Sequence, residues 1–175
     1  MEKQILASEI FKKSYIRGEF LLRSGKTSNE YFDKYQFESN PILLNEIANQ
    51  LLNLLPKDIE ILAALEMGGI PIATAISLKT GIPIVFVRKK AKEYGTNKIA
   101  EGSEIEGKKL LIIEDVVTSG GQIILSVEEL RNRGAIVEKA ICVIDREQRG
   151  KDNLSNNGIQ LFSLFTMSEL KLSQK

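Results

Sequence analysis

The apolar positions near the N-terminus follow a helical period. In the charged segment 1–14 they fall at Ile5, Leu6, Ile10 and Phe11. This segment has no uninterrupted apolar stretch and no small-residue cleavage site, so it predicts a folded helix rather than a secretion signal. Segment 20–37 has two apolar and aromatic stretches around a Ser-Gly-Lys-Thr-Ser-Asn centre, a pattern typical of a hairpin or an ordered loop between short strands.

Asn40 and Pro41 mark the start of a second helix, because Asn is a favoured N-cap and Pro a favoured first helical residue. The apolar positions that follow keep a helical period up to Pro56, at Leu43, Leu44, Ile47, Leu51 and Leu55.

From residue 61 onward, short apolar runs alternate with longer segments of helical character. The apolar runs predict strands at residues 61–65, 84–87, 110–113, 135–144 and 159–165. The intervening segments predict helices at residues 70–79 and 123–133, and a short helix follows the last strand. Apolar strands that alternate with helices indicate a parallel sheet covered on both faces. Right-handed crossovers bring the carboxyl ends of the strands to one edge, where such sheets bind ligands.

Residues 88–109 interrupt this alternation with many charged and few apolar positions. Loops of this length within a compact domain are usually functional or disordered. A solvated run of charge is the simpler interpretation of the lysines in this segment.

Length and charge narrow the class of protein. A chain of 175 residues can bury a core as one domain. Its 24 Lys and Arg against 23 Asp and Glu give a net charge of +1, so no global field attracts nucleic acid or anionic lipid, and we expect neither as a partner. No apolar run reaches the roughly 20 residues that a membrane span needs.

The chain contains no histidine and a single cysteine, Cys142. These counts exclude Ser-His-Asp and Cys-His nucleophiles, histidine-ligated metals, intramolecular disulfides and thiolate zinc clusters. We interpret Cys142 as a small core residue and expect a reduced, cytoplasmic compartment. Carboxylates, Lys, Arg, hydroxyl groups and backbone amides remain to carry the chemistry.

The segment LLIIEDVVTSGGQ, residues 110–122, is the most informative. Its small residues, from Thr118 to Gly121, predict a turn whose backbone N–H groups bind a phosphate at a helix N-terminus. The acids Glu114 and Asp115 can accept hydrogen bonds from ribose hydroxyl groups and help to place a hydrated Mg²⁺. As an alternative, the two acids cap the next helix and the glycines form an ordinary turn.

This segment resembles the phosphoribosyl-diphosphate signature of type I phosphoribosyltransferases. The resemblance implies an α/β fold with a central parallel sheet flanked by helices. It also implies a single domain over residues 1–175, with a small hood from about residues 1–40 and 155–175 and a mobile loop at about 88–103.

Four further segments resemble orotate phosphoribosyltransferases in particular. FLLRSGKTSNEYFD, residues 20–33, is similar to the hood motif of that family and places Arg23 near the reaction centre and Tyr31 and Phe32 in the base pocket. From the residues alone, packing in the core is the more usual role for such an aromatic pair. ALEMGGIPIATAIS, residues 64–77, is similar to the diphosphate turn. Some members of the family have Lys where this chain has Gly68, so its contacts must come from backbone N–H groups.

VRKKAKEYGTNKIAEG, residues 87–102, resembles the mobile catalytic loop of the family. The resemblance maps diphosphate contacts onto Arg88, Lys89 and Lys92, with Lys92 reaching into the site of a second subunit, and therefore implies a homodimer. Many members of the family have a histidine where this chain has Tyr94. VIDREQRG, residues 143–150, resembles the motif whose arginine, here Arg146, recognises orotate, although a surface charge cluster is the simpler interpretation.

The resemblance implies transfer of ribose 5-phosphate from phosphoribosyl diphosphate to N1 of orotate, in pyrimidine synthesis, with Mg²⁺ bound through substrate and water near Glu114 and Asp115. The implied catalytic residues are Arg88, Lys89, Lys92 and Asp115. The implied contacts to phosphoribosyl diphosphate are Gly68, Gly69, Arg88, Lys89, Lys92, Tyr94, Glu114, Asp115, Val116, Val117, Thr118, Ser119, Gly120, Gly121 and Gln122. The implied contacts to orotate are Arg23, Tyr31, Phe32, Thr118 and Arg146.

Three other functions stay open at this point. A purine or other nucleobase phosphoribosyltransferase would share residues 110–122 but not residues 87–102 or 143–150. A regulator that senses phosphoribosyl diphosphate would be expected to show a basic surface or an appended DNA-binding domain, which the net charge and the length argue against. An inactive paralogue is the third.

Overall fold

The computed structural model describes residues 1–21, 25, 27–89 and 99–174. Its centre is a six-stranded sheet in the order β5-β4-β3-β6-β7-β8. The strands are β3 (Ile61–Leu65), β4 (Ile84–Val87), β5 (Ala100–Gly102), β6 (Lys109–Val117), β7 (Ile136–Asp145) and β8 (Gln160–Thr166). β3, β4, β6, β7 and β8 run parallel, as predicted, and β5 adds an antiparallel edge beside β4.

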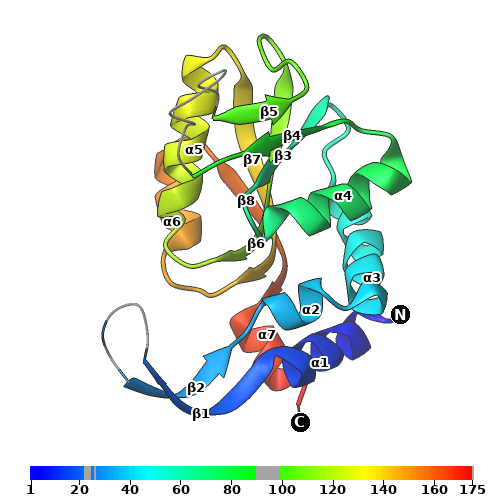
Figure 1. The fold of residues 1–175 in the computed structure, drawn as a ribbon, viewed down its shortest axis with the longest axis vertical. Helices are drawn as coiled ribbons and strands as arrows, with labels where there is room; N and C mark the ends of the chain where they lie inside the picture. The colour runs from blue at the N-terminus through cyan, green and yellow to red at the C-terminus, as the bar shows by residue number, and fades with distance from the viewer. Residues whose placement is uncertain (22–24, 26, 90–98, 175) are drawn as a thin grey trace.

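Helices cover both faces of this sheet (Figure 1). On one side lie α3 (Pro41–Leu51) and α4 (Gly69–Thr80), with the short 3-10 helix Leu52–Leu54 after α3. On the other side lie α5 (Gly121–Asn132) and α6 (Gly150–Asn156). The alternation of side chains along β6 supplies both layers: Leu111 and Ile113 enter the core under α3 and α4, and Leu110 and Ile112 the core under α5.

The remaining elements form a smaller body beside the carboxyl ends of the strands, drawn at the bottom of Figure 1. They are α1 (Lys3–Ser14), the antiparallel hairpin β1 (Tyr15–Leu21) and β2 (Thr27–Phe32), α2 (Tyr35–Glu38) and α7 (Met167–Leu172). We call these five elements the hood from here on. The expected hood range 155–175 is therefore divided, because β8 belongs to the central sheet and α7 to the hood.

The hood and the sheet share one hydrophobic core. Leu6 and Ile10 of α1, Phe37 of α2 and Leu170 of α7 are fully buried in the same cluster as Ile113 of the sheet. The hood therefore has no separate core, and its position relative to the sheet is set by tight packing.

The boundaries predicted from apolar patterns hold well where the pattern is strong. Asn40 caps α3 as predicted, since its Oδ1 accepts hydrogen bonds from the N–H groups of Ile42 and Leu43 at 3.0 and 3.1 Å. β5, α2 and α6 were not predicted. β5 has only three residues, and α6 buries only Gly150 and Leu154, so neither has a readable period. The hairpin also begins at Tyr15 rather than at the predicted Phe20. Because β1 is largely exposed, apolar positions did not mark its first residues.

Across the described ranges, no helix combines the length and the apolar character required to cross a bilayer.

Candidate functional site

The site lies where the carboxyl ends of β3, β6 and β7 meet the hood. The loops that leave β6 and β7 run between the sheet and the hood in Figure 1. A hydrogen bond from the N–H group of Arg146 to the carbonyl of Val117, at 2.9 Å, joins the ends of β6 and β7. The expected phosphate turn after β6 and the expected base-recognition residue after β7 are therefore neighbours.

The turn after β6 has the features of an anion site. Thr118 and Ser119 are exposed, and Gly120 has φ of 75° and is the N-cap of the twelve-residue helix α5. No side chain caps this helix, so its first amide groups lack intrahelical acceptors and face the turn. The helix dipole favours negative charge at the same point. This geometry suits a phosphate group bound by backbone N–H groups.

Helix α6, which was not predicted, supports this turn from behind. The Asn153 side chain donates a hydrogen bond to the carbonyl of Ser119 at 2.9 Å. A Cβ atom on Gly150 would lie 2.5 Å from the carbonyl oxygen of Thr118, so only glycine allows this approach. The motif VIDREQRG thus ends in a glycine with a packing role.

The other expected contacts in residues 116–122 differ in exposure: Val117 is buried, Val116 and Gln122 are half-buried, and Gly121 is exposed.

The turn after β3 packs directly on β6. The peptide bond between Glu66 and Met67 is cis. A Cβ atom on Gly69 would lie 2.2 Å from the carbonyl oxygen of Ile113, and one on Gly68 would lie 1.6 Å from Oδ2 of Asp115. Both glycines are therefore required for the turn to close on the strand. The sequence explained Gly68 only by what it could bind, and the structure adds this steric reason.

The two adjacent acids have different environments. Both lie within β6, and Gly120 rather than either acid is the N-cap of α5, so the capping alternative is wrong. Glu114 is half-buried, and its Oε1 accepts a hydrogen bond from the N–H group of Asp115 at 3.0 Å. Asp115 is 0% exposed. Its Oδ2 lies 2.5 Å from Nζ of Lys34, the N-cap of α2, and its Oδ1 accepts from the N–H group of Val116.

A third carboxyl group, Glu38 at the end of α2, joins this cluster and is only 5% exposed. Burial and the proximity of Asp115 raise the pKa of Glu38 to about 9. Burial and Asp115 also raise the pKa of Glu114 well above its ordinary value. Burial opposes ionisation of Asp115, but hydrogen bonds from Glu114, Glu38 and Lys34 outweigh it and lower the pKa of Asp115. The cluster therefore contains one charged pair, Lys34 and Asp115, and a Glu38 that is protonated at neutral pH, while burial disfavours ionisation of Glu114 as well.

A cavity of about 250 Å³ lies between the hairpin, α7 and the loop after β7. It brings together three of the five residues expected to contact orotate, Tyr31, Phe32 and Arg146. Tyr31 is 44% exposed and so is not a core residue, whereas Phe32 also packs against the core. Nε of Arg146 is buried and has no hydrogen-bond partner among the described residues. The full lining is Tyr15, Ser28, Glu30, Tyr31, Phe32, Arg146, Gln148, Met167 and Lys171. We call this cavity the base pocket.

The loop that carries Arg146 is held in an unusual conformation. Glu147 and Arg149 have φ of 57° and 65°, which is rare outside glycine. Asp145 Oδ1 accepts a hydrogen bond from the N–H group of Glu147 at 2.8 Å, and Glu147 Oε2 accepts from the N–H and hydroxyl groups of Ser168, at 2.9 and 2.6 Å. These bonds tie the loop to α7 and fix the position of Arg146. They also show that Asp145 and Glu147 have structural partners, so this segment is not a loose surface charge cluster.

Glu30 is a residue of the base pocket that the sequence did not indicate. Its carboxylate accepts a hydrogen bond from the Tyr15 hydroxyl group at 2.5 Å and lies 3.7 Å from Nζ of Lys171. The Tyr15 hydrogen bond and Lys171 lower the pKa of Glu30, so it is charged at neutral pH. Because Lys171 is separated from the hairpin by most of the chain, no local pattern could have indicated this pair.

The described part of the expected mobile loop comprises its two ends. The N–H group of Arg88 donates to the carbonyl of Ile99 at 2.8 Å, and Nε of Arg88 lies 3.7 Å from Oε1 of Glu101 in β5. The N–H group of Lys89 donates to Oε1 of Glu66 at 2.6 Å, which places the loop base beside the Gly68 turn. The predictions for Arg23, Lys92 and Tyr94 fall outside the described residues.

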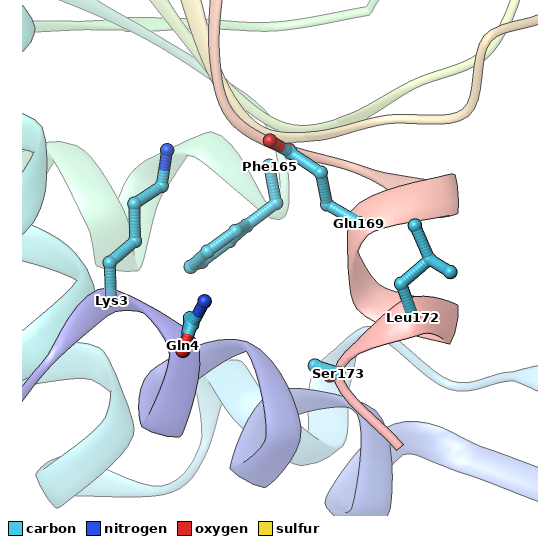
Figure 2. A pocket seen from close by; sticks show the side chains of 6 residues that line it. All are labelled: Lys3, Gln4, Phe165, Glu169, Leu172 and Ser173. Atoms are coloured by element: carbon cyan, nitrogen blue, oxygen red, sulfur yellow. The ribbon is translucent and has the colours of Figure 1, made fainter. Parts of the chain in front are cut away.

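A larger cavity, about 540 Å³, lies elsewhere among the described residues (Figure 2). It lies between α1 and α7 and is lined by Lys3, Gln4, Phe165, Glu169, Leu172 and Ser173. Helix α7 separates it from the base pocket, because Met167 and Lys171 point to one side and Glu169 and Leu172 to the other. None of the expected site residues lines it.

Among the described residues, no group of three or more His, Cys, Asp or Glu side chains could hold a metal ion by itself.

Comparison with known proteins gives consistent results. A model of the phosphoribosyl transferase domain matches residues 35–159. An orotate phosphoribosyltransferase of Nocardioides sp. is 44% identical over 170 residues, which cover 97% of this chain and 95% of that relative. The solved orotate phosphoribosyltransferase of Mycobacterium tuberculosis in complex with Fe(III) dicitrate has a TM-score of 0.86 at 27% identity, with 96% and 98% of the two chains covered. The same protein in complex with 5-phospho-α-D-ribosyl 1-diphosphate has a TM-score of 0.82 at 25% identity, with 97% and 98% covered.

Fold and site place the chain among the type I phosphoribosyltransferases, since the matched domain model runs through both glycine turns and the acidic pair. The identity of 44% over nearly the whole length allows a narrower assignment. The chain belongs to the orotate phosphoribosyltransferase family.

The protonated state of Glu38 has a measurable consequence for stability. The folded protein holds this proton up to about pH 9, whereas an unshifted glutamate releases it near pH 4.5. Because the folded state binds more protons in this range, Glu38 lowers the stability of the wild type as the pH rises. Glu38→Gln removes this titration. As the pH rises, the free energy of unfolding of the variant should therefore increase relative to that of wild type, by at most about 1.4 kcal/mol per pH unit.

Urea unfolding at about pH 6 and about pH 9 measures this difference. Glu19→Gln, on the exposed face of β1, is the matched control and should show no such trend. A Glu38→Gln difference that stays constant across the range would contradict a protonated Glu38.

Proposed function

We propose that this enzyme transfers the 5-phosphoribosyl group from phosphoribosyl diphosphate to N1 of orotate, forming orotidine 5′-monophosphate and diphosphate in pyrimidine biosynthesis. The observation that carries the proposal is the position of the base pocket next to the phosphate turn. Arg146 belongs to both, since its side chain lines the pocket and its backbone bonds to the strand that delivers the turn.

The base pocket suits a planar, anionic ligand. Tyr31 and Phe32 provide aromatic faces, and the buried Nε of Arg146 is a donor that a carboxylate or an imide edge can satisfy. Arg23, which the family resemblance places near the reaction centre, and Thr118, which is exposed beside the pocket, complete the proposed orotate contacts.

The reaction requires no covalent nucleophile. The C1′–oxygen bond to diphosphate breaks, N1 of orotate supplies the electron pair of the new bond, and the N1 proton passes to the departing diphosphate or to water. Orotate is an anion, and C1′ reacts through an oxocarbenium-like state, so catalysis is mainly positioning and electrostatic stabilisation. The amides of residues 118–122 hold the 5′-phosphate, and the Gly68 and Gly69 amides hold the diphosphate. Cations of the loop, Arg88, Lys89 and Lys92, stabilise the departing negative charge.

The residues present fit a Mg²⁺ ion that binds through substrate and water. The carboxylate of Asp115 is fully buried and already paired with Lys34, so it is not a direct ligand in this conformation. Glu114 retains exposure and carries oxygen atoms that can accept hydrogen bonds from the water shell of Mg²⁺. When bound, the ion would neutralise charge on the diphosphate. Glu114 would orient its water molecules and the ribose hydroxyl groups.

A homodimer with a shared loop is part of the proposal. The ends of the loop are close together beside the Gly68 turn, and large apolar side chains are exposed nearby, with Met67 at 58% and Phe86 at 40%. An apolar surface at this place suits a subunit contact from which Lys92 reaches the neighbouring site. We also propose a cytoplasmic location, where the buried free thiol of Cys142 stays reduced.

An assay of base specificity tests the function. With phosphoribosyl diphosphate and Mg²⁺, the enzyme should release diphosphate with orotate but not with uracil, adenine or hypoxanthine. Uracil is the sharpest control, because it lacks only the carboxylate. Release with adenine or hypoxanthine would identify a purine enzyme, and binding of phosphoribosyl diphosphate without turnover of any base would identify a regulator or an inactive paralogue.

Arg146→Gln should lower kcat/KM for orotate by about 10- to 100-fold, because hydrogen bonds to charged groups contribute roughly 1.5–3 kcal/mol. KM for phosphoribosyl diphosphate should change much less. Lys151→Gln, an exposed residue of α6, is the control for the loss of one positive charge nearby. Equal losses for both substrates would argue against base recognition by Arg146.

Mixed dimers test the shared loop. Lys92→Ala and Asp115→Asn should each lower activity strongly when purified separately. If Lys92 acts in the neighbouring site, a mixed dimer of the two variants has one site in which both residues are native. After subunit exchange, activity should therefore recover toward half of that expected for the same number of wild-type subunits. If mass measurement shows that the dimers are mixed and activity does not recover, Lys92 acts in the site of its own subunit.

A further inference from the structure

Two charged residues outside the family motifs contact the centre of the site. Lys34 and Glu38 flank α2 in the hood, one helical turn apart, and both side chains point toward β6. Neither was singled out by the sequence, and the proposed reaction does not use either of them.

The contact of Lys34 is specific in its geometry. Nζ lies 2.5 Å from Oδ2 of Asp115, and this oxygen is the atom that closes on Gly68. Asp115 is 0% exposed, and Lys34 retains 33% exposure of its side chain. Lys34 therefore covers one side of the carboxylate while the Gly68 turn covers another.

The charges around Asp115 explain why a cation is needed there. Three carboxyl groups, Glu38, Glu114 and Asp115, surround one ammonium group. One oxygen of Glu38 is buried and has no hydrogen-bond partner among the described residues, so Glu38 has no second cation to bind. Without Lys34, the Asp115 carboxylate would be buried beside two further acids with no opposite charge, which is strongly unfavourable.

We propose that Lys34 is a positioning residue for phosphoribosyl-diphosphate binding, which holds the Asp115 carboxylate against the Gly68 turn and so fixes the turn that binds diphosphate. The inference rests on the proposed function for the identity of the ligand. Lys34 itself does not touch the reacting atoms. Its effect passes through Asp115 to the glycine turn and to Glu114, whose Oε1 is bonded to the Asp115 amide.

The test compares Lys34→Met, Lys34→Arg and the control Lys57→Met, an exposed lysine in the loop before β3. The readout is calorimetric binding of phosphoribosyl diphosphate with Mg²⁺ and without orotate, so it does not depend on base specificity. Lys34→Met should weaken binding about tenfold or more, as loss of a group that orients a binding residue typically does. Lys34→Arg should restore most of the affinity, and Lys57→Met should have no effect.

Two further measurements separate positioning from general stability. In a cycle with Asp115→Asn, the loss caused by Lys34→Met should be much smaller than in wild type, since the charge that Lys34 balances has been removed. In steady state, KM for phosphoribosyl diphosphate should rise more than KM for orotate. Thermal unfolding shows whether each variant is folded at the assay temperature.

Unchanged affinity in folded Lys34→Met would overturn the proposal, as would additive effects in the cycle. Tighter binding would also overturn it, because it would mean that Lys34 blocks the acid rather than supporting it. If wild type binds phosphoribosyl diphosphate but releases no diphosphate with orotate, the proposed function fails while the inference about Lys34 is still decided by the binding data. Absence of binding in wild type would reject both.

Discussion

The burial of one carboxylate, that of Asp115, is the constraint on which the site depends. It lies at the junction of β6, the turn after β3 and α2 of the hood, and each of these makes a different contribution. Gly68 provides space, Lys34 provides charge, and the strand provides a rigid position. A buried ion is tolerated only when it is paired, so the hood and the sheet must fold against each other for this centre to exist.

In the proposed reaction, different groups around that centre bind different parts of phosphoribosyl diphosphate. Backbone amides of the two glycine turns and the loop cations are assigned to its phosphate groups, and the carboxyl groups to its ribose. The base pocket has its own pair of opposite charges, Glu30 and Lys171, beside Arg146. Arg146 is therefore the basic group of the pocket that has no acid paired with its buried Nε among the described residues, which suits recognition of an anionic ring.

Much of this architecture could be predicted because it follows from local patterns. The uniformly apolar runs around Ala63 and Ile112 predicted buried parallel strands, and the glycines of both turns predicted backbone sites for phosphate. What could not be predicted depends on distant contacts. In the sequence, Lys34 and Glu38 look like an ordinary exposed pair, and only the packing of α2 on β6 buries Glu38 and brings Lys34 to Asp115. The adjacent acids looked equivalent, whereas the pleat of β6 and the position of Lys34 shift their pKa values in opposite directions.

The construction of the base pocket also has a consequence for synthesis on the ribosome. Its walls come from residues 15–32 at one end of the sequence and from Met167 and Lys171 near the other. The phosphate turn and its supports, by contrast, are complete by residue 156. A nascent chain therefore has all residues of the phosphate turn before it can form a base pocket. Of these two parts, the pocket proposed to bind the base is the later one to be complete.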